Sequence, residues 1–378
     1  MRFTDEQRTF ATAVREFCAR ECGTSAQRDA LTDGGALDTS RALLEKLAGH
    51  GWLGVSVPEE YGGAGAGMVE ECLFLEETAR GLAPIHAYGT GLTAAQTYLR
   101  YGTEEQKKDV VGGLCRGRVE AIALSEPGAG SDLGSARLKA VADGGDYVIT
   151  GQKTWTTAAH LADHVLVLTR TTTGAKKHDG LTLLVVPADA SGLAIRPIST
   201  MSTHTVNDLY FTDVRVPAAN VVGEVGQAWR HLMRGLSVER LIIAAMSLGA
   251  AERALDDVVA YVKEREQFGR TIGSFQAVRH RIADLATEIA CSRSFVYEVA
   301  ERIDAGEEEQ LAREGAMAKL KCTEVAKLVT LEAMQLMGGA GYASEYGMES
   351  QVRKALAPPI YGGANEIQRE IIGKSFGL

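Results

Sequence analysis

The stretch QAWRHLMRGLSVERLIIAAMSLG, residues 227–249, has the spacing of an amphipathic helix with a carboxylate on its apolar face. Residues separated by three and four positions share one face of a helix. That face carries Leu232, Leu236, Glu239, Ile243 and Met246. Loss of water on such a face raises the pKa of a carboxylate towards the range of a general base. Structural ion pairs are commoner, however, so Glu239 could instead pair with Arg234 or Arg240 and only tie helices together.

The composition is that of a globular protein with more than one domain. The chain has 378 residues, 45% hydrophobic and 24% charged, which suits two or three domains. Its 40 basic and 49 acidic residues give a net charge of −9, so no general attraction for nucleic acid or an anionic membrane is expected. The six cysteines show no zinc spacing, and no stretch approaches about 20 consecutive apolar residues. We therefore predict a cytoplasmic protein without a metal site.

The periodicity changes twice along the chain and predicts three domains. Residues 1–119 have helical spacing, as in Thr39–His50 and Val69–Arg80. Residues 120–226 contain short β-branched segments roughly ten residues apart, which predicts a sandwich or barrel. These segments are Tyr147–Thr150, His164–Thr169, Leu181–Pro187, Leu193–Pro197 and Asp208–Val216. Helical spacing returns in residues 227–378, so the predicted fold class is α+β, with an N-terminal helical, a middle β and a C-terminal helical domain.

Two motifs near the start of the middle β domain have the residue types of a ligand site. ALSEPGAGSD (123–132) contains Gly128 and Gly130, which allow close backbone approach and can present N–H groups to an anion. It lacks the ending of a P-loop and the βαβ context of a Rossmann fingerprint, so it could also be only a tight turn. QKTWTT (152–157) places a tryptophan beside hydroxyl groups, which suits a flat aromatic cofactor. Core packing is the ordinary alternative for that tryptophan.

Three motifs of the C-terminal domain place cations or glycines at helix ends. KEREQFGRTIGSFQ (263–276) carries two arginines, QLMGGAGY (335–342) ends a helix in paired glycines, and YGGANEIQR (361–369) opens the last helix. Arginines and free backbone N–H groups at such places bind phosphate or carbonyl groups. The ordinary alternative is a glycine C-cap followed by a surface helix.

Taken together and in this order, the five motifs resemble those of the acyl-CoA dehydrogenase family, and the resemblance runs nearly end to end. It implies that the C-terminal domain is a four-helix bundle and that the cofactor is non-covalent FAD. The FAD-binding positions of the family match Leu124, Ser125, Ser131, Trp155, Thr157, Ala364, Asn365 and Glu366. The positions that hold the FAD of a neighbouring subunit match Arg265, Phe268, Gln276, Gln335, Gly338 and Gly339. This second set implies a homotetramer built as a dimer of dimers.

The resemblance also implies α,β-dehydrogenation of an acyl thioester. In the family a carboxylate removes the α-proton while the β-hydrogen leaves as hydride to flavin N5, and a backbone N–H polarises the thioester carbonyl. Ser131, Arg240 and Gly362 match substrate-binding positions, and the polarising N–H matches Gly362. Many members carry the base where this chain has Gly362. A minority, including isovaleryl-CoA and long-chain acyl-CoA dehydrogenases, carries it on the earlier helix in a Glu-Arg-Leu context, which Glu239-Arg240-Leu241 matches.

We therefore predict that Glu239 is the base of an FAD-dependent acyl-CoA dehydrogenase that passes electrons to an electron-transfer flavoprotein. Two alternatives remain open. The substrate could be an acyl or aminoacyl thioester on a carrier protein, for example a prolyl one. The chain could also be a non-catalytic flavoprotein subunit that completes the site of a partner in a hetero-oligomer.

Overall fold

The computed structural model describes residues 3–378, apart from the side chains of residues 234–236. The chain divides into two compact units. The helical unit comprises Met1–Arg28, Gly67–Ala83 and Ser237–Leu378, and the sheet unit comprises Asp29–Ala66 and Pro84–Leu236. Each unit is therefore assembled from segments that are not continuous in the sequence.

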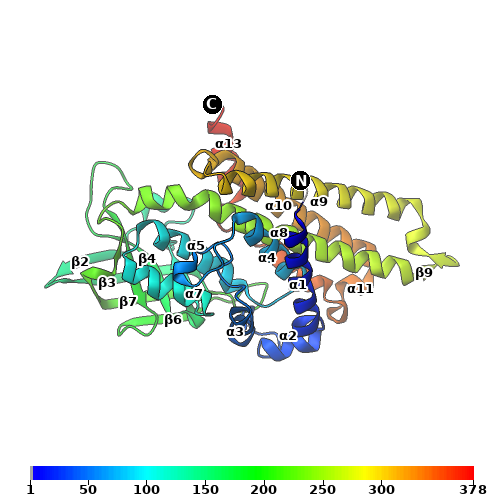
Figure 1. The fold of residues 1–378 in the computed structure, drawn as a ribbon, viewed down its shortest axis with the longest axis horizontal. Coiled ribbons are helices and arrows are strands. Elements are labelled where there is room, and N and C mark those ends of the chain that lie inside the picture. The colour runs from blue at the N-terminus through cyan, green and yellow to red at the C-terminus, as the bar shows by residue number, and fades with distance from the viewer. Residues whose placement is uncertain (1–2) are drawn as a thin grey trace. The chain divides into compact units, whose positions relative to one another are not determined.

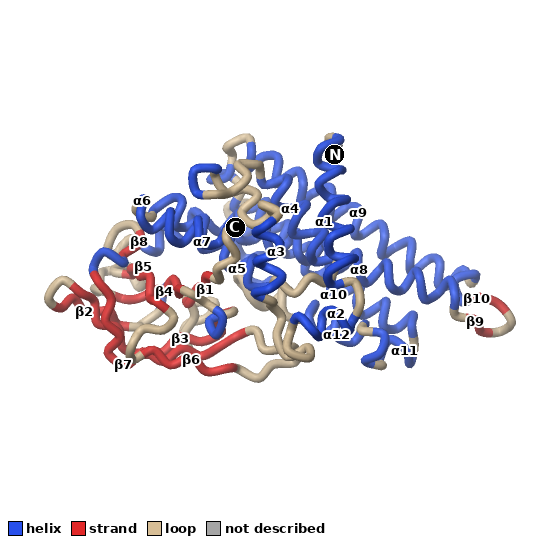
Figure 2. Tube along the Cα trace, turned by 60° about the horizontal axis from the view of Figure 1, so that its bottom comes forward, coloured by secondary structure: helices blue, strands red, loops and turns tan. Residues whose placement is uncertain are grey.

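Three long helices form the main part of the helical unit. They are α8 (Ala228–Glu264, in this unit from Ser237), α9 (Gln276–Asp304) and α10 (Ala312–Met337). These helices lie side by side in Figures 1 and 2. A hairpin of β9 (Glu266–Gln267) and β10 (Arg270–Thr271) joins α8 to α9. The shorter helices of the unit are α1 (Asp5–Cys22), α4 (Met68–Arg80), α11 (Gly339–Tyr342), α12 (Met348–Ala355) and α13 (Asn365–Lys374).

Side-chain caps fix the starts of two helices in this unit. Thr4 caps α1 through reciprocal hydrogen bonds with Gln7, which form a capping box. Asp304, at the end of α9, accepts hydrogen bonds from the backbone N–H groups of Met68 (2.6 Å) and Val69 (3.1 Å). A carboxylate at a helix N-terminus satisfies free N–H groups and complements the helix dipole. The cap thus attaches α4 to the C-terminal helices.

The sheet unit contains a mixed sheet in the order β6-β7-β3-β2-β4-β5-β8, with β1 pairing in parallel with β4. Figure 2 shows these strands in red. Their bounds are β1 Glu120–Ala123, β2 Lys139–Asp143, β3 Asp146–Thr157, β4 His164–Arg170, β5 Leu181–Pro187, β6 Leu193–Pro197, β7 Val206–Pro217 and β8 Val221–Val222. The other helices are α2 (Ser25–Leu31), α3 (Arg41–Gly49), α5 (His86–Tyr101), α6 (Glu104–Gln106) and α7 (Gly112–Cys115). Inward-facing apolar residues such as Val165, Leu184 and Phe211 form the core of the sheet.

The α+β fold class predicted from the sequence is confirmed, and all five predicted strands are present. β3 extends from Asp146 to Thr157, so the QKTWTT motif, predicted near the start of the β domain, forms the second half of this strand. The periodicity does not reveal β1 and β2, because alanines and charged residues occupy places where strands usually carry β-branched ones. Within residues 3–378, no helix combines the length and the hydropathy that crossing a bilayer requires.

Candidate active site

Glu239 lies on α8 between two strongly buried residues, yet its own side chain keeps an accessible surface. Val238 and Arg240 are 2% and 6% exposed, whereas Glu239 is intermediate. Burial raises the pKa of the Glu239 carboxyl, and the positive charges of Arg240 and Lys319 oppose this only in part. Among the side chains that the structure describes, Glu239 makes no ion pair; the alternative partner Arg234 lies outside them.

The neighbours of Glu239 on the same helix confirm the apolar face predicted around it. Leu232 and Ile243 are 8% and 7% exposed, and Met246 is partly buried. The side chain of Leu236 lies outside the described residues. The carboxylate therefore lies on a largely apolar face. Such surroundings raise the pKa of a carboxyl group towards neutral pH, where it can act as a general base.

Arg240 acts on Glu239 through its charge. Its Nη1 donates to the carbonyl oxygen of Ala312 at 3.3 Å, and its Nε is buried without a hydrogen-bond partner in the described part of the chain. Burial lowers the pKa of Arg240, which the carboxylate of Glu239 partly restores. The Nε–H of this buried guanidinium is therefore available to donate a hydrogen bond to an acceptor atom of a ligand.

Gly362 lies in the turn before α13 and directly faces Glu239. Its φ is +60°, and a Cβ built on it would lie 2.3 Å from Cδ1 of Ile243 and 3.7 Å from Oε1 of Glu239. A side chain at this position would therefore clash with Ile243, and the carboxylate that lies beside the turn is that of Glu239 on α8. Within the described residues, the N–H of Gly362 has no hydrogen-bond partner. An unused N–H and an unpaired carboxylate thus lie close together.

The three residues after this turn differ in their surroundings. Ala364 precedes α13, and Glu366, in the first turn of α13, is exposed. Asn365 is only 2% exposed, and its side-chain amide bonds to Lys319, Thr323 and Glu324. The side chain of Asn365 therefore serves the fold itself, and any contact of Asn365 with FAD stays a prediction for its backbone.

The 123–132 loop of the sheet unit exposes backbone donors. Leu124 and Ser125 follow β1, and the carbonyl of Ser125 accepts from the N–H of Thr154 at 2.9 Å. The N–H groups of Gly128, Gly130 and Ser131 have no partner among the residues that the structure describes. A Cβ on Gly128 or Gly130 would meet nothing within 4 Å, so the backbone is open there. Such a loop is suited to oxygen atoms of a phosphate or pyrophosphate.

Trp155 is presented to solvent on a strained backbone. The indole is 59% exposed and the residue has φ +59° at a register shift between β3 and β7. A bulky residue in this region costs energy that the surrounding strand must offset, and such outliers cluster at ligand sites. Next to it, Oγ1 of Thr156 is buried without a described partner, and Thr157 ends the strand. An exposed flat ring suits a flat aromatic cofactor, and the adjacent Thr154 bonds to the 123–132 loop.

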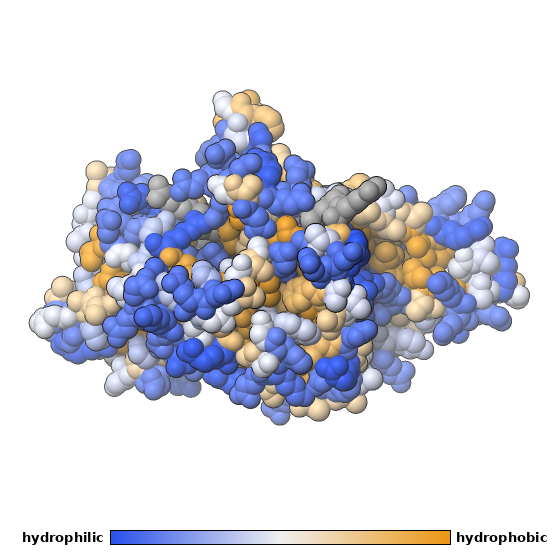
Figure 3. Space-filling view, in the orientation of Figure 1, coloured by the Kyte–Doolittle hydropathy of each residue, from blue (hydrophilic) through white to orange (hydrophobic). Residues whose placement is uncertain are grey.

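The first three residues of the predicted intersubunit set lie in the hairpin after α8 or next to it in the sequence. Arg265 precedes β9, Phe268 is 93% exposed at the tip, and Gln276 is the first residue of α9. On the face shown in Figure 3, apolar residues also reach the surface of the long helices towards their β9 end. Gln335, Gly338 and Gly339 lie elsewhere, at the end of α10 and the start of α11.

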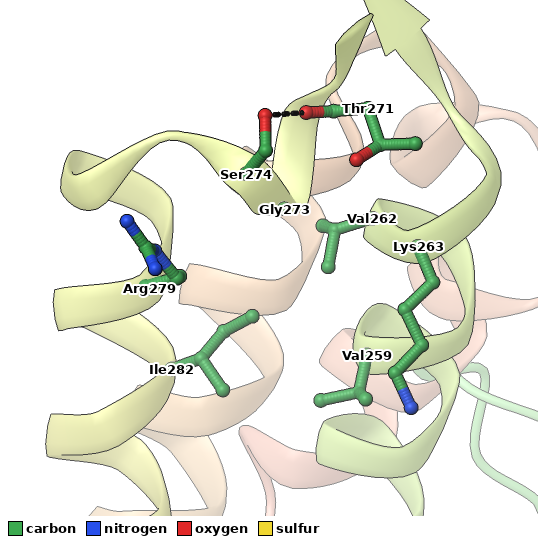
Figure 4. Close-up of a pocket in the computed structure, with 8 residues that line it drawn as sticks. All are labelled: Val259, Val262, Lys263, Thr271, Gly273, Ser274, Arg279 and Ile282. Atoms are coloured by element: carbon green, nitrogen blue, oxygen red, sulfur yellow. Dashed lines mark hydrogen bonds between the residues drawn. The ribbon is translucent and has the colours of Figure 1, made fainter.

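A shallow pocket of about 390 Å³ lies at the base of this hairpin. Figure 4 shows apolar Val259, Val262 and Ile282 between α8 and α9, with Ser274 donating to the carbonyl of Thr271 at 2.6 Å. None of the predicted site residues lines it. In the described part of the chain, no cluster of three or more His, Cys, Asp or Glu has the form of a metal site.

Sequence reasoning missed two buried lysines, Lys153 and Lys319, which are both 0% exposed. Lys153 donates to Glu126 and to the carbonyl of Leu124, and so supports the 123–132 loop. Lys319 bonds to the Gly362 turn. The signal was available for Lys319, because it shares an apolar helix face with residues three positions away on either side. The same test identified Glu239.

Comparison with known proteins agrees with these observations. Models of the acyl-CoA dehydrogenase N-terminal, middle and C-terminal domains match residues 4–118, 121–214 and 226–377. A mitochondrial isovaleryl-CoA dehydrogenase of Solanum tuberosum is 37% identical, over 98% of this chain and 90% of that protein. An acyl-CoA dehydrogenase structure from Geobacillus kaustophilus has 35% identity and a TM-score of 0.93, covering 100% of this chain and 99% of the other.

A third similar structure, of a prolyl acyl carrier protein oxidase, is 28% identical with a TM-score of 0.88 and covers 100% of both chains. Three domain models in sequence order and near-complete coverage of the similar proteins lead to one assignment. The chain belongs to the acyl-CoA dehydrogenase family and is an FAD-dependent oxidoreductase that acts on CH–CH bonds.

Proposed function

We propose that the protein catalyses α,β-dehydrogenation of an acyl thioester, with Glu239 as the base that removes the α-proton. The observation that supports this most directly is the arrangement in the helical unit. An unpaired carboxylate with a raised pKa faces Gly362, whose N–H has no partner among the described residues. A base and a carbonyl-polarising donor are the two groups that α-proton removal needs from the protein.

Each step of the proposed dehydrogenation is assigned to one group of the protein or to FAD. Gly362 N–H donates to the thioester carbonyl oxygen, which makes the α-proton more acidic, and Glu239 accepts that proton. FAD, when bound, takes up the β-hydrogen with its electron pair, so a carbon–carbon double bond forms. Arg240 opposes the effect of burial on the Glu239 pKa and so favours the ionised carboxylate that can accept a proton. The rate is expected to rise with pH through a midpoint above the ordinary carboxyl range.

The other site residues are proposed to hold the cofactor. In the sheet unit these are Leu124, Ser125, Ser131, Trp155 and Thr157; in the helical unit they are Ala364, Asn365 and Glu366. Arg265, Phe268, Gln276, Gln335, Gly338 and Gly339 are proposed to reach the FAD of a second copy in a homotetramer. The high exposure of Phe268 supports this. An electron-transfer flavoprotein as acceptor and a cytoplasmic location complete the proposal.

The test is Glu239→Gln, which keeps the size of the side chain and removes its basicity. The variant should retain bound flavin and reduce it with substrate about 1,000-fold more slowly, the scale of a lost general base. Glu370→Gln is the matched control, because Glu370 is 60% exposed and pairs with Lys374. Anaerobic flavin bleaching by a panel of CoA and matched carrier-protein thioesters gives the readout and separates the two carriers. Undiminished bleaching in Glu239→Gln would refute the assignment.

A further inference from the structure

Lys319 is a buried ammonium group that holds the turn containing Gly362. It is 0% exposed on α10, and its Nζ donates to the carbonyl oxygen of Gly363 at 2.9 Å and to Oδ1 of Asn365 at 3.0 Å. Both acceptors are neutral, so no carboxylate bonds directly to this charge in the described structure. A buried lysine normally has such a partner, because an isolated ammonium ion is costly to bury.

Gln368 completes the frame around the turn. Its Nε2 donates to the carbonyl oxygens of Gly362 (3.2 Å) and Gly363 (2.8 Å), and it is 0% exposed. The N–H of Asn365 bonds to the carbonyl of Pro359 at 2.9 Å. Lys319 and Gln368 thus hold the two peptides that follow the Gly362 N–H, through the carbonyl oxygens of Gly362 and Gly363. The position of Gly362, and with it the place of its N–H, therefore depends on these two side chains.

The positive charge of Lys319 acts on groups from three helices. Glu239 and Arg240 on α8, Glu324 on α10 and Glu366 on α13 all influence it. Burial lowers the pKa of Lys319 to about 8, and Glu239 is the largest influence in the opposite direction. In return, Lys319 lowers the pKa of Glu239, after Arg240. The ammonium thus acts on both elements of the active site, the carboxylate and the turn that faces it.

We propose that Lys319 is a positioning residue for α-proton removal: it fixes the turn that aims the Gly362 N–H and supplies positive charge towards Glu239. This rests on the proposed function. A bonded but unpaired ammonium ion suits both tasks, because its charge is not consumed by a direct carboxylate partner. Above the pKa of about 8 Lys319 loses its proton, so the charge acting on Glu239 disappears as pH rises through that value.

Three substitutions separate the two tasks. Lys319→Gln keeps a donor for the turn but removes the charge, Lys319→Met removes both, and Lys319→Arg keeps both. Without the charge, the Glu239 pKa rises, so the acid limb of the pH–rate profile should move up by about one pH unit in Gln and Met. Lys319→Met should also lower kcat about tenfold or more, because the turn that contains Gly362 loses the hydrogen bonds that fix its position. Arg should restore the wild-type acid limb.

Lys321→Met is the control, because Lys321 lies two residues away on α10, is 48% exposed and pairs with Glu288. It should leave the profile unchanged. An acid limb that stays in place in either Lys319→Gln or Lys319→Met overturns the proposal, so one folded variant is enough for the test.

A second readout does not depend on turnover. Infrared difference titration, with Glu239→Gln subtracted, follows the Glu239 carboxyl directly in the wild type and in Lys319→Gln. An upward shift of its midpoint supports the charge coupling even if no thioester is oxidised, in which case the proposed function alone fails. An unmoved midpoint refutes the coupling even if Glu239→Gln abolishes activity.

Discussion

The buried lysines Lys153 and Lys319 each support a loop that is proposed to bind a ligand, and they do so in different ways. Lys153, in the sheet unit, bonds directly to the carboxylate of Glu126 at 2.8 Å and to the carbonyl of Leu124 at 2.7 Å. Lys319, in the helical unit, bonds only to neutral oxygens. Burial lowers the pKa of each lysine to about 8. The two lysines are alike in burial and pKa, and the difference lies in the pKa of the carboxylate near each of them.

Burial acts to raise the pKa of Glu126, but Lys153 and the N–H groups of Leu138 and Arg137 lower it overall. Burial also raises the pKa of Glu239, and there the opposing charges do not reverse the effect. Glu126 is fully paired and supports the loop, whereas Glu239 has no ion pair among the described side chains, in line with its proposed role as the base. A buried carboxylate therefore becomes a candidate base when its direct partners are missing, and burial alone is not sufficient.

Among the substitutions that test this comparison, Gly362→Ala should have the largest effect on flavin reduction, because it disturbs the turn that faces the proposed base. Its φ of +60° strains any side chain, and the new Cβ would lie 2.3 Å from Ile243 Cδ1, so the turn and its N–H must move. A displacement of this kind costs about 100-fold in kcat. Stopped-flow flavin reduction measures it.

Gly347→Ala provides the control for Gly362→Ala. Gly347 also has positive φ (+68°), but no atom lies within 4 Å of its added Cβ. Backbone strain alone should change flavin reduction little. Wild-type kinetics in Gly362→Ala would remove this turn from the mechanism.

Lys153→Met should have the next largest effect, on the loop and not on the base. Glu126, whose side chain is 10% exposed, would lose its ion pair, which costs about 3 kcal/mol of stability for a buried pair. Because the pair lowers the Glu126 pKa, it stabilises the fold at pH values above the ordinary carboxyl pKa. The loss of stability in Lys153→Met should therefore be measured in that pH range. FAD affinity should fall, and isothermal titration of the apoprotein measures this.

The acid limb of the pH–rate profile should stay in place in Lys153→Met, unlike in the Lys319 series. Lys139→Met, at an exposed position on β2, serves as the control for affinity and stability. A shifted acid limb in Lys153→Met would mean that the two lysines do not have separate roles.

Glu120→Gln should have the smallest effect on catalysis, although burial raises the pKa of Glu120 to about 8. Glu120 accepts from Tyr98 at 2.8 Å, with His164 nearby, inside the sheet unit. Its raised pKa stabilises the fold fully below the ordinary carboxyl pKa, and this contribution is lost as pH rises towards 8, by at most about 1.4 kcal/mol per unit.

Glu120→Gln should therefore flatten the fall of unfolding free energy between pH 5 and about 8, while flavin reduction stays unchanged. Urea denaturation at several pH values measures the slope, and exposed Glu105→Gln is the control. Slow flavin reduction in Glu120→Gln would contradict this expectation. It would mean that catalysis also depends on Glu120, away from the Gly362 turn.

Periodicity was sufficient to predict the α+β class, the five strands and the apolar face around Glu239, because each depends on neighbours along the chain. The parts that escaped prediction depend on contacts between distant segments. Lys319 acquires its role only when α10 meets the turn before α13, and the exposure of Trp155 follows from a bulge opposite β7. Spacing along one segment contains no information on such pairings.

The Asp304 cap of α4 has a consequence for synthesis on the ribosome. The capping bonds join residues 235 and 236 positions apart, so α4 is made long before its cap. Translation at roughly 5–20 residues per second leaves an interval of tens of seconds. During that time the N–H groups of Met68 and Val69 lack this carboxylate, so α4 acquires its cap only after α9 has been synthesised.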